Sequence, residues 1–172
     1  LDNSSPTAPR TADIILPNHR YTGLWNNAVR LALDLRKQWL LFVSSDVQVP
    51  EMKLLADCME TILQKPSVGI YTPSLRPDSR VAYTACFHRP TGKLRECYMI
   101  EGFFFLARTD ILARLYPVSC EENRFGFGID LMSACYAYRT GRRVLVDDRV
   151  MIYHPAAVHP TPVDLAVEEQ VK

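Results

Sequence analysis

Short apolar runs alternate with segments of helical periodicity along the first part of the chain. Residues 12–16, 40–43 and 68–71 are strand-like runs. Apolar side chains recur at helical spacing over residues 51–64 and over residues 23–36, where the predicted apolar stripe is Leu24, Ala28, Leu31 and Leu35. Such alternation is typical of α/β domains, in which helices cover a buried sheet. We therefore expect an α/β fold, with residues 40–43 as a buried strand of a parallel sheet.

The pattern changes after residue 80. Residues 81–88 and 94–99 are strand-like and flank the turn signature Arg89-Pro90-Thr91-Gly92, which predicts a hairpin. Further elements are expected as a strand at 103–107, a short helix at 110–115, a longer helix at 129–138, and strands at 143–146 and 150–153.

Size and composition limit the class of protein. The chain has 172 residues, of which 48% are hydrophobic, and this predicts one domain core over residues 1–154. Residues 155–172 are broken by prolines and are expected to be a tail or linker. A formal net charge of +1 gives no electrostatic case for nucleic acid as a partner.

The sequence gives no sign of secretion or membrane insertion. No apolar run is long enough for a membrane span, and no signal-peptide pattern opens the chain. The five cysteines are widely spaced and form no Cys-x-x-Cys pair, which fits reduced thiols and argues against a zinc site. We expect a cytoplasmic protein, free or peripheral to the membrane.

Asp46 follows Ser44 and Ser45 at the end of the run 40–43. A carboxylate at the carboxyl end of a strand is well placed to hold a divalent cation, and through it the phosphates of a ligand. The alternative is that Asp46 caps the next helix, since Pro50 marks a first helical turn. The pattern alone leaves both interpretations open.

Three further polar residues are candidates for a site. Asp130 stands at the start of the helix predicted at 129–138, where it is either a carboxylate favoured by the helix dipole or a general base. His154 ends the last predicted strand, so a metal ligand is one interpretation and a packing residue the other. Asp2 lies in a turn-like segment, Asp2-Asn3-Ser4-Ser5, that could equally be a disordered terminus.

Taken in order, these segments resemble the inverting family-2 glycosyltransferases, which have the GT-A (nucleotide-diphospho-sugar transferase) fold. The order and spacing of the motifs carry the resemblance, since none is specific alone. The matching segments are LDNSS at 1–5, TGLWNNA at 22–28, FVSSDV at 42–47, EGFFFLAR at 101–108, GFGIDL at 126–131 and VMIYHP at 150–155.

The resemblance implies a three-layer α/β/α domain with a mixed sheet. The family's N-terminal βα segment and second strand would lie upstream of Leu1, so we expect this chain to lack them. The implied activity is transfer of a sugar from a nucleotide-diphospho-sugar donor to a hydroxyl of a saccharide or lipid-linked acceptor, with inversion, in polysaccharide or glycoconjugate synthesis.

Roles follow from the resemblance residue by residue. Asp2 would contact the nucleotide base, and Asp46 would hold Mn²⁺ or Mg²⁺ against the donor diphosphate, with His154 as a further metal ligand. Asp130 would be the catalytic base, and the acceptor pocket would be lined by Glu101 and Gly102.

This chain has one acid in Ser44-Ser45-Asp46 where the fuller family pattern has two, and Ile129 precedes the base where the family often has an acid. A non-catalytic sugar or nucleotide-sugar binding domain of the same fold is therefore kept as an alternative. The cluster Phe103-Phe104-Phe105 is either core or part of an acceptor pocket, and aromatic residues in such clusters are more often core.

Overall fold

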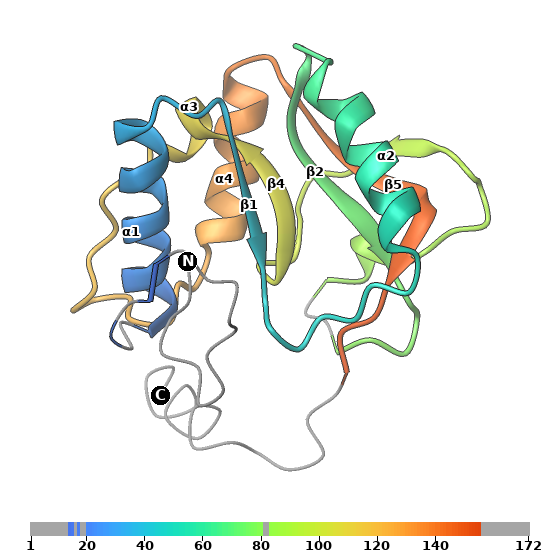
Figure 1. Cartoon of the computed structure of the whole chain (residues 1–172), viewed down its shortest axis with the longest axis horizontal. Coiled ribbons are helices and arrows are strands. Elements are labelled where there is room, and N and C mark those ends of the chain that lie inside the picture. The colour runs from blue at the N-terminus through green and yellow to red at the C-terminus, as the bar shows by residue number, and fades with distance from the viewer. Residues whose placement is uncertain (1–13, 16, 18–19, 81–82, 156–172) are drawn as a thin grey trace.

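The computed structural model describes residues 14–155 except 16, 18–19 and 81–82. Residues 12, 13 and 16 of the predicted strand at 12–16 therefore lie outside the described residues, as do Asp2 and the tail from residue 156. The described elements are helices α1 (Arg20–Asp34), α2 (Met52–Leu63), α3 (Thr109–Leu112) and α4 (Ile129–Arg139), the 3₁₀ helix η1 (Thr84–Cys86), and strands β1 (Trp39–Val43), β2 (Val68–Leu75), β3 (Leu94–Glu96), β4 (Phe104–Arg108) and β5 (Arg143–Ile152) (Figure 1).

The five strands form one mixed sheet in the order β1-β4-β2-β5-β3. β2 and β5 are parallel neighbours at its centre, whereas β4 runs antiparallel to both β1 and β2, and β3 runs antiparallel to β5. The expectation of an α/β class with a mixed sheet is confirmed.

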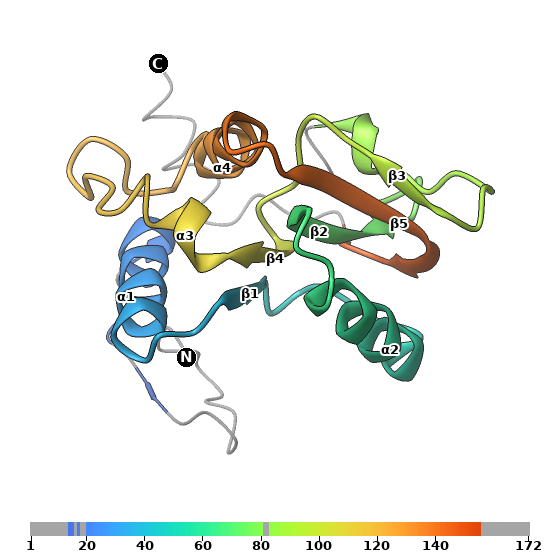
Figure 2. The same cartoon turned by 90° about the horizontal axis from the view of Figure 1, so that it is seen from above.

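Helices cover both faces of this sheet. Successive residues of a strand point to opposite faces. In β2, Tyr71 packs in the cluster that contains α2, while Ile70 packs in the cluster that contains α1, α3 and α4. In β4, Phe105 faces the same way as Ile70. Figure 2 shows α2 on one side of the sheet and α4 on the other, which makes three layers.

The face that α1 buries differs from the predicted stripe. Trp25, Ala28, Val29 and Ala32 are buried at the spacing i, i+3, i+4, i+7 of a helix face. Leu35, which was expected on the apolar stripe, lies beyond the end of α1 and is 57% exposed. Trp25 is fully buried, and the largest side chain of the helix sets the buried face.

β1 is not the buried parallel strand that the sequence predicted. Within the described residues it pairs only with β4, antiparallel, and so forms an edge of the sheet. Phe42 stacks on Phe105 with ring centroids 4.9 Å apart, whereas Leu41 and Val43 are 41% and 50% exposed. The latter two line an apolar groove of about 480 Å³ between β1 and α2. Apolar composition alone does not tell an edge strand from a central one.

The predicted hairpin over residues 81–88 and 94–99 is also wrong. Residues 84–86 form the 3₁₀ helix η1, and β3 pairs with β5 rather than with the segment before the turn. The Arg95 guanidinium explains why β3 pairs with β5, because it donates hydrogen bonds to the carbonyls of Ala85 and Phe87 and to Asp148, which lies where the register of β5 shifts. Ala85 and Phe87 lie in the segment 81–88, which the predicted hairpin would have paired with residues 94–99.

β5 joins two predicted strands into one. The ladder between β2 and β5 shifts register between Pro73 and Ser74, where Pro73 is opposite Asp147 and Ser74 is opposite Met151. A proline has no amide hydrogen for the ladder, so a register shift accommodates it within a central strand. This is why β2 continues to Leu75 beyond the expected end at residue 71.

Asp148 provides a test of this arrangement. Its buried carboxylate accepts hydrogen bonds from the Arg95 guanidinium (3.0 Å), the Thr91 hydroxyl (2.8 Å) and the Arg89 amide (3.2 Å). Replacing Asp148 by Ala leaves the Arg95 charge unpaired and should lower the free energy of unfolding by about 3–5 kcal/mol in urea titrations. Asp78→Ala, which removes an exposed partner of Arg76, should cost less than about 1 kcal/mol. Equal losses for the two variants would contradict the account.

Candidate active site

Asp46 and His154 lie side by side although 108 positions separate them in the sequence. Asp46 is in the turn after β1, His154 follows β5, and a two-way backbone bridge between Gln48 and Tyr153 holds the two segments together. The His154 Nε2 atom is 3.1 Å from the Asp46 Oδ2 atom. Its Nδ1 atom is 2.9 Å from the Arg80 carbonyl oxygen.

The hydrogen bonds of His154 limit its protonation states. A carbonyl oxygen only accepts, so Nδ1 carries a proton and donates it to the Arg80 carbonyl. The Nε2 atom then either carries a second proton, which it donates to Asp46, or presents a lone pair to a carboxylate oxygen. Two electron-rich atoms at this distance repel unless a proton or a cation lies between them. A proton or a cation between His154 Nε2 and Asp46 Oδ2 is therefore needed to stabilise the pair.

The alternative role of Asp46 as a helix cap is excluded. The residue at the N-cap of α2 is Glu51, five positions later, and helix α2 begins at Met52. The Asp46 side chain is 56% exposed, while the His154 imidazole is 15% exposed. An exposed carboxylate beside a fixed imidazole is accessible to a ligand from solvent.

Phe103 connects this pair to the start of β4. Its ring stacks on the His154 imidazole with centroids 4.1 Å apart and planes 8° from parallel. The Phe103 carbonyl accepts a hydrogen bond of 2.7 Å from the Ser44 amide, which extends the β1 ladder toward Asp46. Of the aromatic cluster Phe103-Phe104-Phe105, Phe104 and Phe105 are core, whereas Phe103 is partly buried beside His154.

Asp130 lies next to Gly102, the residue before Phe103. It occupies the first turn of α4, and its Oδ1 atom accepts a hydrogen bond of 2.8 Å from the Leu131 amide. Its Oδ2 atom would be 3.6 Å from a Cβ atom placed on Gly102. Burial raises the pKa of the Asp130 carboxyl above its ordinary value, and the backbone N–H groups of Leu131 and Gly102 oppose that effect. The helix-start and general-base interpretations are both compatible with this geometry.

Glu101 has a different environment from Gly102. Its side chain is buried, and the carboxylate accepts a hydrogen bond from the Tyr83 amide. That bond holds the segment beginning at Tyr83 against the start of β4.

Of the residues singled out from the sequence, Asp46, His154, Gly102 and Asp130 thus lie along one edge of the fold. Asp2 lies outside the described residues.

Tyr21 is a member of this site that the sequence did not indicate. Its hydroxyl donates a hydrogen bond of 3.0 Å to the Gly102 carbonyl, and burial followed by the Asp130 charge raises the pKa of its phenol. The ring lies directly on Gly126, in the loop that leads to Asp130. An aromatic residue two positions before the helix predicted at 23–36 carries no sequence signal, because only the fold brings Gly102 and Gly126 to it.

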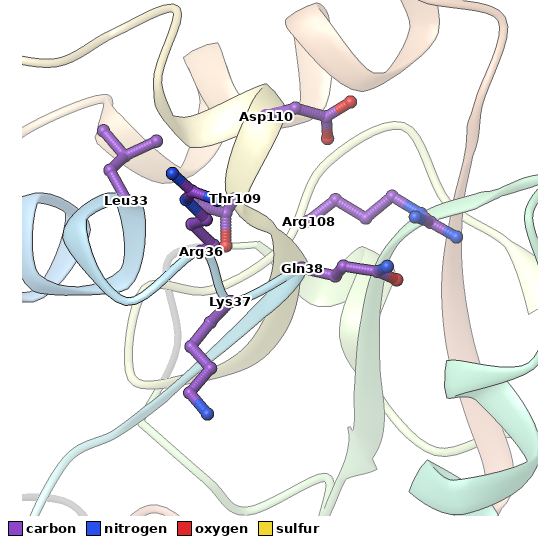
Figure 3. Close-up of a pocket in the computed structure, with 7 residues that line it drawn as sticks. All are labelled: Leu33, Arg36, Lys37, Gln38, Arg108, Thr109 and Asp110. Atoms are coloured by element: carbon purple, nitrogen blue, oxygen red, sulfur yellow. The ribbon is translucent and has the colours of Figure 1, made fainter.

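A hollow lies at the other end of strands β1 and β4, away from Asp46. It has a volume of about 310 Å³ and is lined by basic side chains, among them Arg36, Lys37 and Arg108. Arg108 is opposite Trp39 in the ladder, whereas the candidate site lies beyond Val43 at the other end. Figure 3 shows the Lys37 and Arg108 side chains pointing away from one another. They do not converge on a common point in the hollow.

Comparisons with known proteins add no family to this geometry: no protein-family model matches the chain, and no curated protein matches it. In the described part of the chain, no group of three or more His, Cys, Asp or Glu side chains is placed to hold a metal ion. No helix among the described residues has the length and apolar character needed to cross a membrane.

Two glycines of the loop before α4 give a matched test of the Tyr21 contact. Gly126 and Gly128 have φ values of +76° and +75°, so alanine at either position costs roughly 1–2 kcal/mol of backbone strain. A Cβ atom on Gly126 would overlap the Tyr21 ring, whereas one on Gly128 meets nothing within 4 Å. We expect Gly126→Ala to lower the free energy of unfolding by at least about 1 kcal/mol more than Gly128→Ala. Equal losses in urea titrations would show that Tyr21 does not need this space.

The burial of Asp130 predicts how its charge affects stability. Because the folded-state pKa is raised, the folded protein binds the proton more tightly than the unfolded chain, and stability falls as pH rises through that range. At neutral pH the full cost of the charge is present, so Asp130→Asn should raise the thermal midpoint. The gain should shrink as pH falls through the folded-state pKa of Asp130 and vanish below about 3.9, the ordinary pKa of an aspartate, because the carboxyl is then neutral in both the folded and the unfolded chain. A midpoint lowered at neutral pH would contradict this expectation.

Proposed function

We propose that this site belongs to a metal-assisted, inverting glycosyltransferase with a GT-A type of fold. The donor would be a nucleotide-diphospho-sugar and the acceptor a hydroxyl of a saccharide or lipid-linked sugar. The observation that carries the proposal is the pairing of Asp46 with His154, whose Nε2 and Oδ2 atoms are 3.1 Å apart. The sequence resemblance assigns the role of metal ligand to Asp46 and that of a further ligand of the same metal to His154.

The donor set fits a divalent cation. Histidines that bind metals commonly donate their other ring N–H to a backbone carbonyl, as His154 does to Arg80. With two protein ligands, the remaining coordination positions are open to phosphate oxygens and water, a pattern common for Mg²⁺ and Mn²⁺ at phosphate sites. When bound, such a cation supplies Lewis-acid stabilisation of a departing diphosphate.

Asp130 is suited to remove the proton of the acceptor hydroxyl. It is a carboxylate of raised pKa, and a general base works best when its pKa is closer to the working pH. Through Gly102 and Phe103 it is connected to the Asp46–His154 pair without belonging to it. A base on one side and a diphosphate site on the other suit attack on the anomeric carbon from the face opposite the leaving group, which inverts its configuration.

One observation favours a second candidate, a non-catalytic nucleotide-sugar or carbohydrate binding domain of the same fold. Ser44 and Ser45 precede Asp46, so the turn after β1 offers a single carboxylate. Fewer acidic ligands weaken metal binding and make it depend more on the phosphates of the ligand. The two candidates differ in whether the bound donor turns over.

The test is calorimetric titration with Mn²⁺ and nucleoside diphosphates, followed by turnover assays with a panel of nucleotide sugars. We expect Asp46→Ala and His154→Ala to weaken metal-dependent diphosphate binding at least about tenfold. Asp130→Asn should keep that binding but lower turnover about 100-fold or more. Asp57→Asn, on the exposed face of α2, is the control and should change neither quantity.

The outcomes separate the candidates. Binding of a nucleotide sugar without transfer or hydrolysis by the wild-type chain would support the binding domain. Binding that is unchanged in Asp46→Ala would show that Asp46 is no metal ligand. Turnover that survives Asp130→Asn would remove the assigned base.

A further inference from the structure

We propose that Tyr21 is a positioning residue, which holds Gly102 so that its backbone N–H faces the Asp130 carboxylate. The inference rests on the proposed function, in which Asp130 acts as the base. Tyr21 is not itself catalytic, because its hydroxyl is directed at a protein carbonyl rather than at the open side of the site.

A hydrogen bond between Tyr21 and Gly102 joins α1 to the segment before β4. The Tyr21 hydroxyl donates to the Gly102 carbonyl at 3.0 Å, across 81 positions of sequence. Burial and the nearby Asp130 charge keep the phenol of Tyr21 protonated, since both raise its pKa. The hydroxyl is therefore a permanent donor and does not compete with Asp130 for a proton at neutral pH.

Gly102 in turn lies against Asp130. Gly102 lies close to both residues: a Cβ atom on it would be in tight contact with the Tyr21 hydroxyl oxygen, at 3.2 Å, and in ordinary contact with Asp130 Oδ2, at 3.6 Å. The Gly102 N–H favours the ionised form of Asp130. A glycine backbone is conformationally permissive, so its orientation depends on bonds to its neighbours. Tyr21 supplies one such bond at the carbonyl.

Tyr21 also contacts the loop that leads to Asp130. Its ring fills the space above Gly126, in the loop that precedes α4. One side chain of α1 thus contacts both the segment before β4 and the loop that carries the base. This is the arrangement by which a supporting residue keeps a functional group in place.

The groups that face Asp130 are few in the described part of the structure. From α1 the titratable group is Tyr21, and from α4 the Leu131 amide donates to the carboxylate. From the segment before β4 the backbone of Gly102 faces it, since Glu101 is turned to the Tyr83 amide. Removing the Tyr21 hydroxyl should therefore act on Asp130 through Gly102.

The experiment compares Tyr21→Phe with Tyr138→Phe. Tyr138 donates a hydrogen bond to the carbonyl of Cys97, in the same segment but away from Asp130, so its variant loses an equivalent bond. In Tyr21→Phe we expect the acidic limb of the pH profile of kcat/KM to move to higher pH and kcat to fall about tenfold, with the donor KM unchanged. Tyr138→Phe should leave the limb where it is.

A second readout does not depend on turnover. The titration of the Asp130 carboxyl, followed by NMR in the folded chain, should move to higher pH in Tyr21→Phe and not in Tyr138→Phe. If Tyr21→Phe fails to fold, Gly102→Ala tests the same contact, and it should also raise the titration midpoint of Asp130. A loss of activity with an unchanged pH profile and an unchanged Asp130 titration would overturn the inference.

The failure of this inference and the failure of the proposed function are distinguishable. If Asp130→Asn retains turnover, the assigned base is wrong whatever Tyr21→Phe does. If Asp130→Asn abolishes turnover while both the pH profile and the Asp130 titration of Tyr21→Phe match the wild type, Tyr21 is overturned as a positioning residue and the base stands.

Discussion

The hydrogen bond from the Ser44 amide to the Phe103 carbonyl extends the antiparallel ladder of β1 and β4 by one step, and the candidate site depends on it. It places the turn containing Asp46 beside the residues that precede β4. Phe103 then stacks on His154, and Gly102 lies against Asp130. Because backbone ladders are continuous and short-range, a shift of one residue in this register would turn every side chain to the other face and separate the two acids from their neighbours.

The two acids of the site lie in contrasting environments, and the contrast suits a division of labour. Asp46 is exposed, so its charge is solvated and open to an incoming cation or ligand. Asp130 is partly buried against Gly102 and Tyr21, where desolvation raises its pKa and opposes the charge. Groups held at a cost to stability in this way are typical of functional positions. The folded protein carries that cost because the surrounding layers are well packed on both faces of the sheet.

Much of the secondary structure was predictable, since α1, α2, α4 and β4 follow periodicity and turn chemistry that act over a few residues. The errors concern partners. β1 was expected to be buried, yet its outer edge has no neighbour among the described strands. The hairpin around Gly92 did not form, because a buried Asp148 gives Arg95 a better partner on β5. The strand predicted at 68–71 continues to Leu75, because a register shift of β5 accommodates Pro73. In each case, the residue that decides the observed pairing is more than 50 positions away from the segment whose pattern led to the wrong prediction.

The sequence by itself determined the α/β class, most element positions, and the residue types of a candidate site, because these follow from local periodicity and from side-chain chemistry. It also put Asp46 and His154 forward together, through their order in a family-like pattern. Only the tertiary structure decided that they touch, that Asp46 is no helix cap, and that Tyr21 belongs beside Asp130. The physical reason is that such contacts join segments 80 or more positions apart. Strand pairing and burial select them, and neither is encoded within a local window.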